Sequence, residues 1–101
     1  MIISNADVYI GKNTTLAYRT IITTNSNSNA PYNHLCKIYP QLYEEVRIGE
    51  NVWIGAGVII LPGCIIGDNC VVAAGAVVVN DISNNVMVAG VPAKIKKEIV
   101  F

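Results

Sequence analysis

The sequence predicts a parallel β-helix built from six-residue repeats. From residue 48 onward an aliphatic residue returns at every sixth position, and the same register appears earlier in the chain. A fixed short period of this kind is the signature of a repeat architecture. Most of the aliphatic residues are also followed, three positions later, by a residue suited to a sharp corner. The aliphatic positions are Ile10, Leu16, Ile22, Ile48, Ile54, Ile60, Ile66, Val72 and Val78.

The corner positions hold glycine, asparagine or aspartate, which tolerate positive φ more readily than other residues do. Arg19 is the one exception. The residues after the corners are small or medium in size and are expected inside, beside the aliphatic column. The predicted corners are Asn13, Asn51, Gly57, Gly63, Asn69, Gly75 and Asp81, and the residues after them include Thr14, Thr20, Val52, Val58, Cys64, Cys70, Ala76 and Ile82.

This pattern favours short strands that stack on the strands of the previous coil and bury a column of isoleucine and valine. A series of short hairpins is the alternative for a period of six. Hairpin strands would alternate polar and apolar residues, with turn pairs between them. Here the aliphatic residues keep a single register instead, so hairpins are excluded.

The repeat is interrupted once, by an inserted loop at about residues 25–43. The composition there turns polar, and it contains two prolines, three tyrosines and the only histidine of the chain, His34. A loop of this length inside a compact repeat array is uncommon and usually functional. The tyrosines either line a binding pocket or fasten the loop; the sequence does not separate these roles.

After Ile82 the repeat decays, and residues 84–101 are expected to cap the stack. Pro92 followed by residues 93–99 predicts a short helix, because proline is favoured at the start of a helix. Ile95 and Ile99 would lie one turn apart and cover the open end of the last coil. The whole chain, residues 1–101, is therefore expected to form a single β-helix domain.

Composition excludes several classes of function. The 101 residues include seven basic and seven acidic ones, so neither nucleic acid nor an anionic membrane is expected as a partner. The longest run of apolar residues and glycine, residues 71–79, is too short to cross a bilayer. No signal-peptide pattern opens the chain, which predicts a cytoplasmic protein. Three cysteines without a CxxC pair fit neither a disulfide framework nor a zinc site.

Several segments carry a resemblance to a known family. They are Ile48-Gly-Glu-Asn-Val-Trp-Ile-Gly-Ala-Gly, Ile60-Leu-Pro-Gly, Ile66-Gly-Asp-Asn, Ala73-Ala-Gly-Ala-Val-Val and Ala89-Gly-Val-Pro-Ala-Lys. Together they resemble the hexapeptide-repeat acyltransferases, in particular the maltose and galactoside O-acetyltransferases and the sugar acyltransferases. Members of this family usually begin with extra coils or a helical segment before the position of Ile10, so this chain looks short at its N-terminus.

The resemblance implies a left-handed parallel β-helix of triangular section, with three hexads to a coil. It also implies a homotrimer, with acetyl-CoA as co-substrate lying in the groove between neighbouring subunits. Ala56 and Ala74 match residues that contact the pantetheine arm through their backbone. Lys94 and Lys97 match basic residues near the CoA phosphates, and on a helix they would share one face. Considered without the family, both lysines would simply be solvated charges.

The chain departs from the family pattern at two places. Val79-Asn80 stands where many relatives have Thr-Lys, so a hydroxyl and a charge near CoA are missing. Asn27 stands where relatives have the histidine that acts as general base, and an amide does not accept a proton at neutral pH. His34, in the same loop, is then the candidate catalytic base, since imidazole titrates in the useful range. Asn27 and Tyr39 are the candidate acceptor-binding residues.

Three functions are compatible with the fold that the resemblance implies. The first is an acetyltransferase that moves the acetyl group of acetyl-CoA to a hydroxyl or amine of a sugar or similar small molecule. The second is a truncated or degenerate relative that trimerises and binds CoA without turnover. The third is a β-helix metalloenzyme of the γ-carbonic anhydrase kind. The third needs three histidine ligands and the chain has one, so no metal site is expected.

Overall fold

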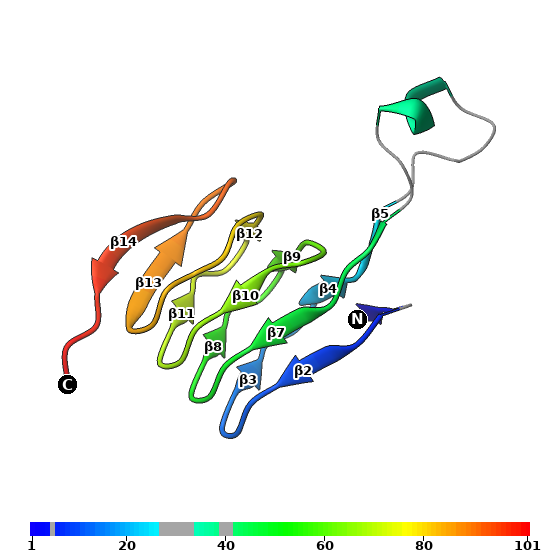
Figure 1. Ribbon diagram of the computed structural model, residues 1–101. Coiled ribbons are helices and arrows are strands. Elements are labelled where there is room, and N and C mark those ends of the chain that lie inside the picture. Colours follow the sequence, from blue (N-terminus) through cyan, green and yellow to red (C-terminus); the bar gives the residue numbers. More distant parts are fainter. Residues whose placement is uncertain (5, 27–33, 39–41) are drawn as a thin grey trace.

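The computed structural model describes residues 1–4, 6–26, 34–38 and 42–101. Three parallel sheets form the walls of a coiled stack (Figure 1). Sheet A contains β1 (Ile2–Ile3), β4 (Ile21–Thr23), β9 (Ile59–Ile60) and β12 (Val77–Val78). Sheet B contains β2 (Val8–Ile10), β7 (Val46–Ile48) and β10 (Ile65–Ile66). Sheet C contains β3 (Thr15–Leu16), β8 (Trp53–Ile54), β11 (Val71–Val72), β13 (Val86–Ala89) and β14 (Lys94–Glu98).

Each coil visits sheet B, then sheet C, then sheet A. Ile59 pairs with Val77, 18 residues later, as three hexads to a coil require. Across the inserted loop Ile22 pairs with Ile60, so the register resumes unchanged after the additional residues. Three parallel walls with this repeat are consistent with the predicted left-handed β-helix.

The two predicted interior columns form the core. Ile54, Ile60 and Val72 have no exposed surface, and Cys64 and Cys70 are buried beside them. Coils pack on coils in register, so every interior side chain meets its counterpart of the neighbouring coil. Ile10 differs: it lies on the first coil and is 42% exposed, because no described coil covers it on its outer side.

The corner residues adopt the expected backbone conformation with one correction. Asn13, Asn51, Gly57, Gly63, Asn69 and Gly75 all have positive φ, and Arg19 has it too, at 61°. Asp81 does not. The last coil is two residues shorter at this corner, since Ile82 bridges to Ile66 only 16 residues before it. The carboxylate of Asp81 instead accepts a hydrogen bond of 2.9 Å from the Ile65 amide.

The insert leaves the stack as an antiparallel ribbon at the corner between sheets A and B. Strand β5 (Asn25–Ser26) pairs with β6 (Leu42–Tyr43), and a short 3₁₀ helix, η1 (His34–Lys37), lies beyond the ribbon, away from the coils (Figure 1). The amide of Glu44 donates to the carbonyl of Thr24 at 2.9 Å and closes the base of the ribbon. The described part of the predicted loop, residues 25–26, 34–38 and 42–43, therefore projects from the stack, and we call it the arm.

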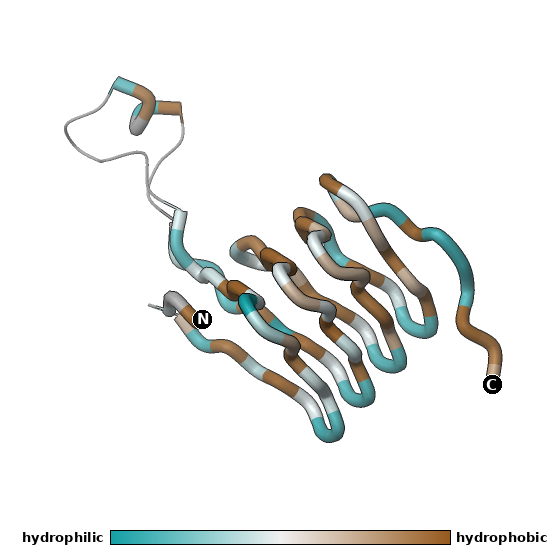
Figure 2. The backbone as a smooth tube through the Cα atoms, turned by 180° about the vertical axis from the view of Figure 1, so that it is seen from behind, coloured by the Kyte–Doolittle hydropathy of each residue, from teal (hydrophilic) through white to brown (hydrophobic). Residues whose placement is uncertain are grey.

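The predicted C-terminal helix is wrong. Residues Lys94–Glu98 form strand β14, antiparallel to β13. Without it, β13 would be an open sheet edge with unpaired backbone groups. Gly90, at φ 97°, helps to reverse the chain so that β14 covers this edge. The last strand is mostly hydrophilic in Figure 2, in contrast to the apolar coils that it closes.

Burial in the core predicts a large difference between two neighbours on β10. Ile66 is 1% exposed and points inward, so Ile66→Ala should lower the free energy of unfolding by about 2–5 kcal/mol, through lost transfer energy and the cavity left behind. Ile65 is 48% exposed on the outer side, and Ile65→Ala should cost less than half as much. Urea denaturation of both variants measures this. Equal costs would mean that the inward and outward sides of β10 are misassigned.

Candidate functional site

The corner between sheets C and A is exposed on three successive coils. Tyr18, Ala56 and Ala74 occupy equivalent positions of successive coils there. The Gly57 amide donates to the Tyr18 carbonyl at 2.9 Å, and the Gly75 amide donates to the Ala56 carbonyl at 2.9 Å. We define this column, Tyr18-Arg19, Ala56-Gly57 and Ala74-Gly75, as the alanine corner. It runs along the axis of the β-helix and brings the two predicted alanines together.

The glycines keep the alanine corner open. Gly57 and Gly75 have φ of 71° and 77°, and a Cβ atom on either one would meet no other atom within 4 Å. Ala56 and Ala74 are themselves exposed. Small side chains and a bare backbone therefore leave room for an extended ligand to approach the main chain closely.

The two predicted lysines lie on β14, the last strand of sheet C. Lys94 pairs with Ala89, and Lys97 pairs with Met87. Directly paired residues in a sheet point to the same face, and a register shift between Met87 and Val88 places both lysines on the outer face of sheet C. The prediction that they share a face is thus correct, although a bulged strand produces it and a helix does not.

The alanine corner leads to Lys94. The strand that precedes the turn at Gly90 pairs with β11, and the Gly90 carbonyl accepts a hydrogen bond of 3.1 Å from Val77, just beyond Gly75. An open backbone column with cationic groups near one end fits an acyl-CoA thioester. The pantetheine arm, with its two amides, matches the column, and ammonium groups match phosphates.

The structure does not bring His34 to this corner within one chain. His34 is exposed on η1, and the arm leaves the stack between sheets A and B, while the alanine corner lies between sheets C and A. Asn27 and Tyr39, the predicted acceptor residues, lie outside the described residues, as does Tyr32. The acceptor side of the predicted site therefore stays a prediction.

Cys64 and Cys70 are structural. Burial raises the pKa of the Cys64 thiol above its ordinary 9.0, and nearby Asp81 adds to the effect. The pKa of Cys70 is also raised, again chiefly by burial. A buried thiol with a raised pKa is a poor nucleophile. No group of three or more potential metal ligands occurs among the described residues.

A charged cluster on the outer face of sheet B was not foreseen from the sequence. The Arg47 guanidinium lies 4.1 Å from the centre of the Tyr9 ring, and its Nε is 2.9 Å from a Glu45 oxygen. The Tyr9 hydroxyl donates to Asp7, which raises the pKa of Tyr9, and Glu45 raises that of Arg47. The cluster follows from the parallel pairing of Tyr9 with Arg47. The sequence could have revealed it only if the pairing register across the insert had been known.

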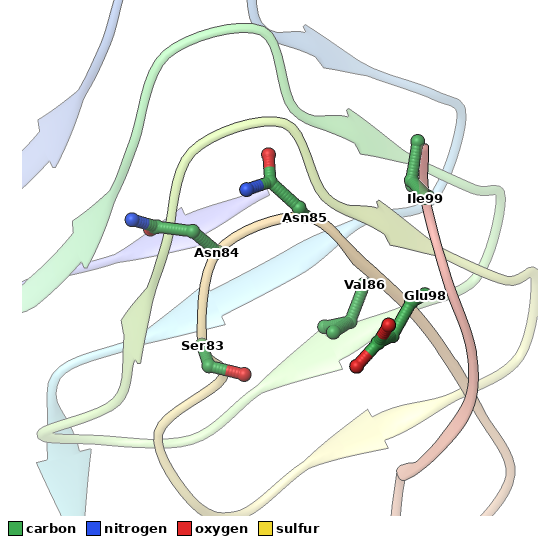
Figure 3. Close-up of a pocket in the computed structure, with 6 residues that line it drawn as sticks. All are labelled: Ser83, Asn84, Asn85, Val86, Glu98 and Ile99. Atoms are coloured by element: carbon green, nitrogen blue, oxygen red, sulfur yellow. The ribbon is translucent and has the colours of Figure 1, made fainter. Parts of the chain in front are cut away.

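Two hollows are lined by described residues outside the arm. Figure 3 shows a polar one of about 330 Å³, lined by Ser83, Asn84, Asn85, Val86, Glu98 and Ile99. A more apolar one, of about 430 Å³, lies over the outer face of sheet C and includes Trp53, which is 61% exposed. None of the site residues predicted from the sequence lines either hollow.

Comparison with known proteins agrees with this geometry. Residues 45–80 match the bacterial transferase hexapeptide (six repeats) family model. The chain is 38% identical to galactoside acetyltransferase in complex with coenzyme A, with a TM-score of 0.85 over 98% of this chain and 48% of that one. It is 40% identical to a maltose O-acetyltransferase from Clostridium difficile 630, with a TM-score of 0.81 over 93% of this chain and 49% of that one. The chain belongs to the hexapeptide-repeat acyltransferase family.

A more distant member of the family also has this fold. A hexapeptide-repeat acetyltransferase from Vibrio cholerae complexed with acetyl coenzyme A is 26% identical, with a TM-score of 0.72 over 93% of this chain and 61% of that one. This hexapeptide-repeat chain spans about half the length of the first two relatives. No curated protein matches it significantly in sequence. No helix among the described residues is long and apolar enough to cross a membrane.

Proposed function

We propose that this protein is an acetyltransferase that moves an acetyl group from acetyl-CoA to a hydroxyl or amine of a sugar or similar small molecule. The observation that carries the proposal is the open alanine corner, with Lys94 near its C-terminal end and Lys97 farther along β14 on the same outer face of sheet C. Relatives of known structure hold coenzyme A or acetyl-CoA, and two are named for galactoside and maltose. A cytoplasmic location is part of the proposal.

In this mechanism the thioester supplies an activated acetyl group, and the chain supplies alignment and a base. The backbone of Ala56 and Ala74 holds the pantetheine arm, while the lysines hold the phosphates. The His34 imidazole accepts the proton of the acceptor hydroxyl or amine as its oxygen or nitrogen bonds to the acetyl carbon. The carbon–sulfur bond breaks, and the proton passes to the departing thiolate. Alignment and a positioned base are the main contributions of such a site.

The position of the arm supports a homotrimer. His34 lies on an arm that projects away from its own coils, so a base on this arm serves the alanine corner of a neighbouring copy. Outward aliphatic residues such as Ile65 are half exposed in the single chain and would gain cover in an assembly. The groove between subunits would then hold both CoA and the acceptor.

A second candidate function is a trimeric protein that does not catalyse acetyl transfer. Asn27 occupies the position of the family base, and an amide does not take up a proton at neutral pH. Under this alternative the protein trimerises and binds CoA without turnover. The CoA and base experiments below separate the two candidates.

The double variant Lys94→Ala/Lys97→Ala tests the cofactor end of the site. It should weaken CoA binding more than dephospho-CoA binding, because each charge-assisted phosphate contact contributes roughly 1.5–3 kcal/mol. Isothermal titration calorimetry with both ligands measures the difference. Lys12→Ala, at the corner between sheets B and C, is the matched control and should change neither. An equal loss for both ligands would show that the lysines do not contact the 3′-phosphate.

The assembly has its own test. Sedimentation equilibrium at micromolar concentration should give three times the mass of the 10.9 kDa chain. A monomer of this size buries only a modest fraction of its surface, which favours association. A clean monomer would contradict the shared site.

The base is tested by two substitutions with opposite expectations. His34→Ala should reduce acetyl transfer about 10²–10⁴-fold, the usual cost of losing a general base. Asn27→His should raise transfer if the family position is the productive one. Transfer is followed by release of free thiol from acetyl-CoA. Unchanged transfer after His34→Ala would remove His34 from the mechanism, and no gain from Asn27→His in a CoA-binding protein would mean that the loop is misaligned with the family.

A further inference from the structure

Arg19 stands out among the corner residues. The described residues with positive φ are glycines or asparagines except for Arg19, whose φ is 61°. The left-handed region brings Cβ close to the backbone and is unfavourable for a long side chain, whereas asparagine or glycine would occupy it more easily. Backbone strain of this kind persists where the side chain serves a purpose, and the inference runs from the observed outlier to a function.

The place of Arg19 gives that function a location. Tyr18-Arg19 forms the end of the alanine corner remote from the lysines. Along sheet C the order is β14, β13, β11, β8 and β3, and Tyr18 lies two residues after the end of β3. Four strand spacings of about 4.8 Å put Tyr18 roughly 19 Å from β14. If phosphates lie at the lysines and the pantetheine arm passes Ala74 and Ala56, the thioester lies beside Tyr18 and Arg19.

This end of the corner has both space and charge. A hollow of about 250 Å³ is lined by Leu16, Ala17 and Tyr18, and the Tyr18 side chain is 89% exposed. In the described part of the chain the one ion pair joins Arg47 to Glu45, so Arg19 has no carboxylate partner there. An unpaired guanidinium presents a planar fork of donors that matches a carboxylate or a phosphate with two parallel hydrogen bonds.

We propose that Arg19 selects acceptors that carry an anionic group, a phosphate or a carboxylate, at the thioester end of the alanine corner. This inference rests on the proposed acetyltransferase function and narrows its substrate class from sugars in general to acidic sugars or sugar phosphates. Arg19 holds the anionic group, the hollow beside Tyr18 accommodates the sugar ring, and the acceptor hydroxyl or amine faces the thioester.

A different role for the same residue is an outcome of the test. A guanidinium beside the thioester could stabilise the oxyanion that develops during transfer. That role would aid every acceptor equally, charged or neutral. Selectivity between acceptors therefore separates recognition from general electrostatic assistance.

The experiment compares the full-length wild-type protein with Arg19→Asn and Arg19→Lys. The probes are glucose 1-phosphate, glucuronate and glucose, titrated calorimetrically without CoA and then used as acceptors with acetyl-CoA. Wild type should favour at least one anionic probe over glucose by tenfold or more in binding and in kcat/KM. Arg19→Asn should abolish this preference. Arg19→Lys should retain part of it, because the charge remains while the fork is lost.

Measuring Tm together with acceptor selectivity distinguishes a role of Arg19 in binding from a role in folding. Arg19→Asn should raise Tm, because asparagine tolerates the positive φ, even as acceptor selectivity falls. The matched control is Asn13→Arg at the other corner of the same coil, where φ is 59°. It should lower Tm by introducing the strain, and it should leave selectivity unchanged. A fall in Tm for Arg19→Asn would show that Arg19 is held for the fold, which overturns the inference.

The remaining outcomes are also decisive. An equal loss of kcat/KM for all three acceptors in Arg19→Asn would assign Arg19 to oxyanion stabilisation and overturn acceptor selection. A wild type without preference among the probes would overturn it as well. A preference for glucose 1-phosphate alone would identify a phosphate site, and one for glucuronate alone a carboxylate site. If wild type fails to bind CoA, the acetyltransferase proposal fails, while the titrations without CoA still decide whether Arg19 holds an anion.

Discussion

The parallel pairing of each coil with the next is the interaction on which the rest of the structure depends. Its register places interior residues of neighbouring coils side by side, 18 residues apart in the regular coils, as Ile60 and Val78 show. A side chain of the wrong size would therefore disturb two neighbouring coils at once. The same register aligns everything on the outside, and this is how Ala56 and Ala74 form an open column. The proposed binding surface therefore follows from the repeat.

This constraint also explains where an insert can be tolerated. The arm begins after β4 and returns before β7, at a corner, and the ribbon of β5 and β6 satisfies its own backbone groups. The coil then resumes with Val46 fully buried. A long excursion at a corner costs little because its ends are held together already. Chemistry can therefore be added to the fold without changing its core.

The core could be predicted from the sequence because an aliphatic residue recurs at the same position of successive repeats. The prediction failed at the C-terminal segment, where Pro92 and the charged residues after it suggested a helix. Local helix preference amounts to tenths of a kcal/mol per residue, while an open sheet edge leaves a row of backbone groups unpaired. Pairing of the open edge of β13 therefore outweighs the local helix preference. A bulge in β14 nevertheless places Lys94 and Lys97 on one face. His34 stays a prediction from residue type alone, since the arm lies outside the six-residue repeat.

Two corners of the β-helix need a residue with positive φ, and they use different residues for it. The difference indicates where a ligand can lie. Between sheets B and C, asparagines take the positive φ, and their amides form a ladder: Asn51 donates to Asn69 at 3.3 Å, and Asn69 donates to Asn85 at 3.0 Å. This corner is the hydrophilic edge in Figure 2, and its polar groups are largely used within the chain. Between sheets C and A, Gly57 and Gly75 take the same conformation and leave the backbone bare, while Arg19 takes it on the first coil. A chain that needed only to turn could have used asparagine at both corners, so glycine at the second corner indicates a surface kept open for a partner molecule.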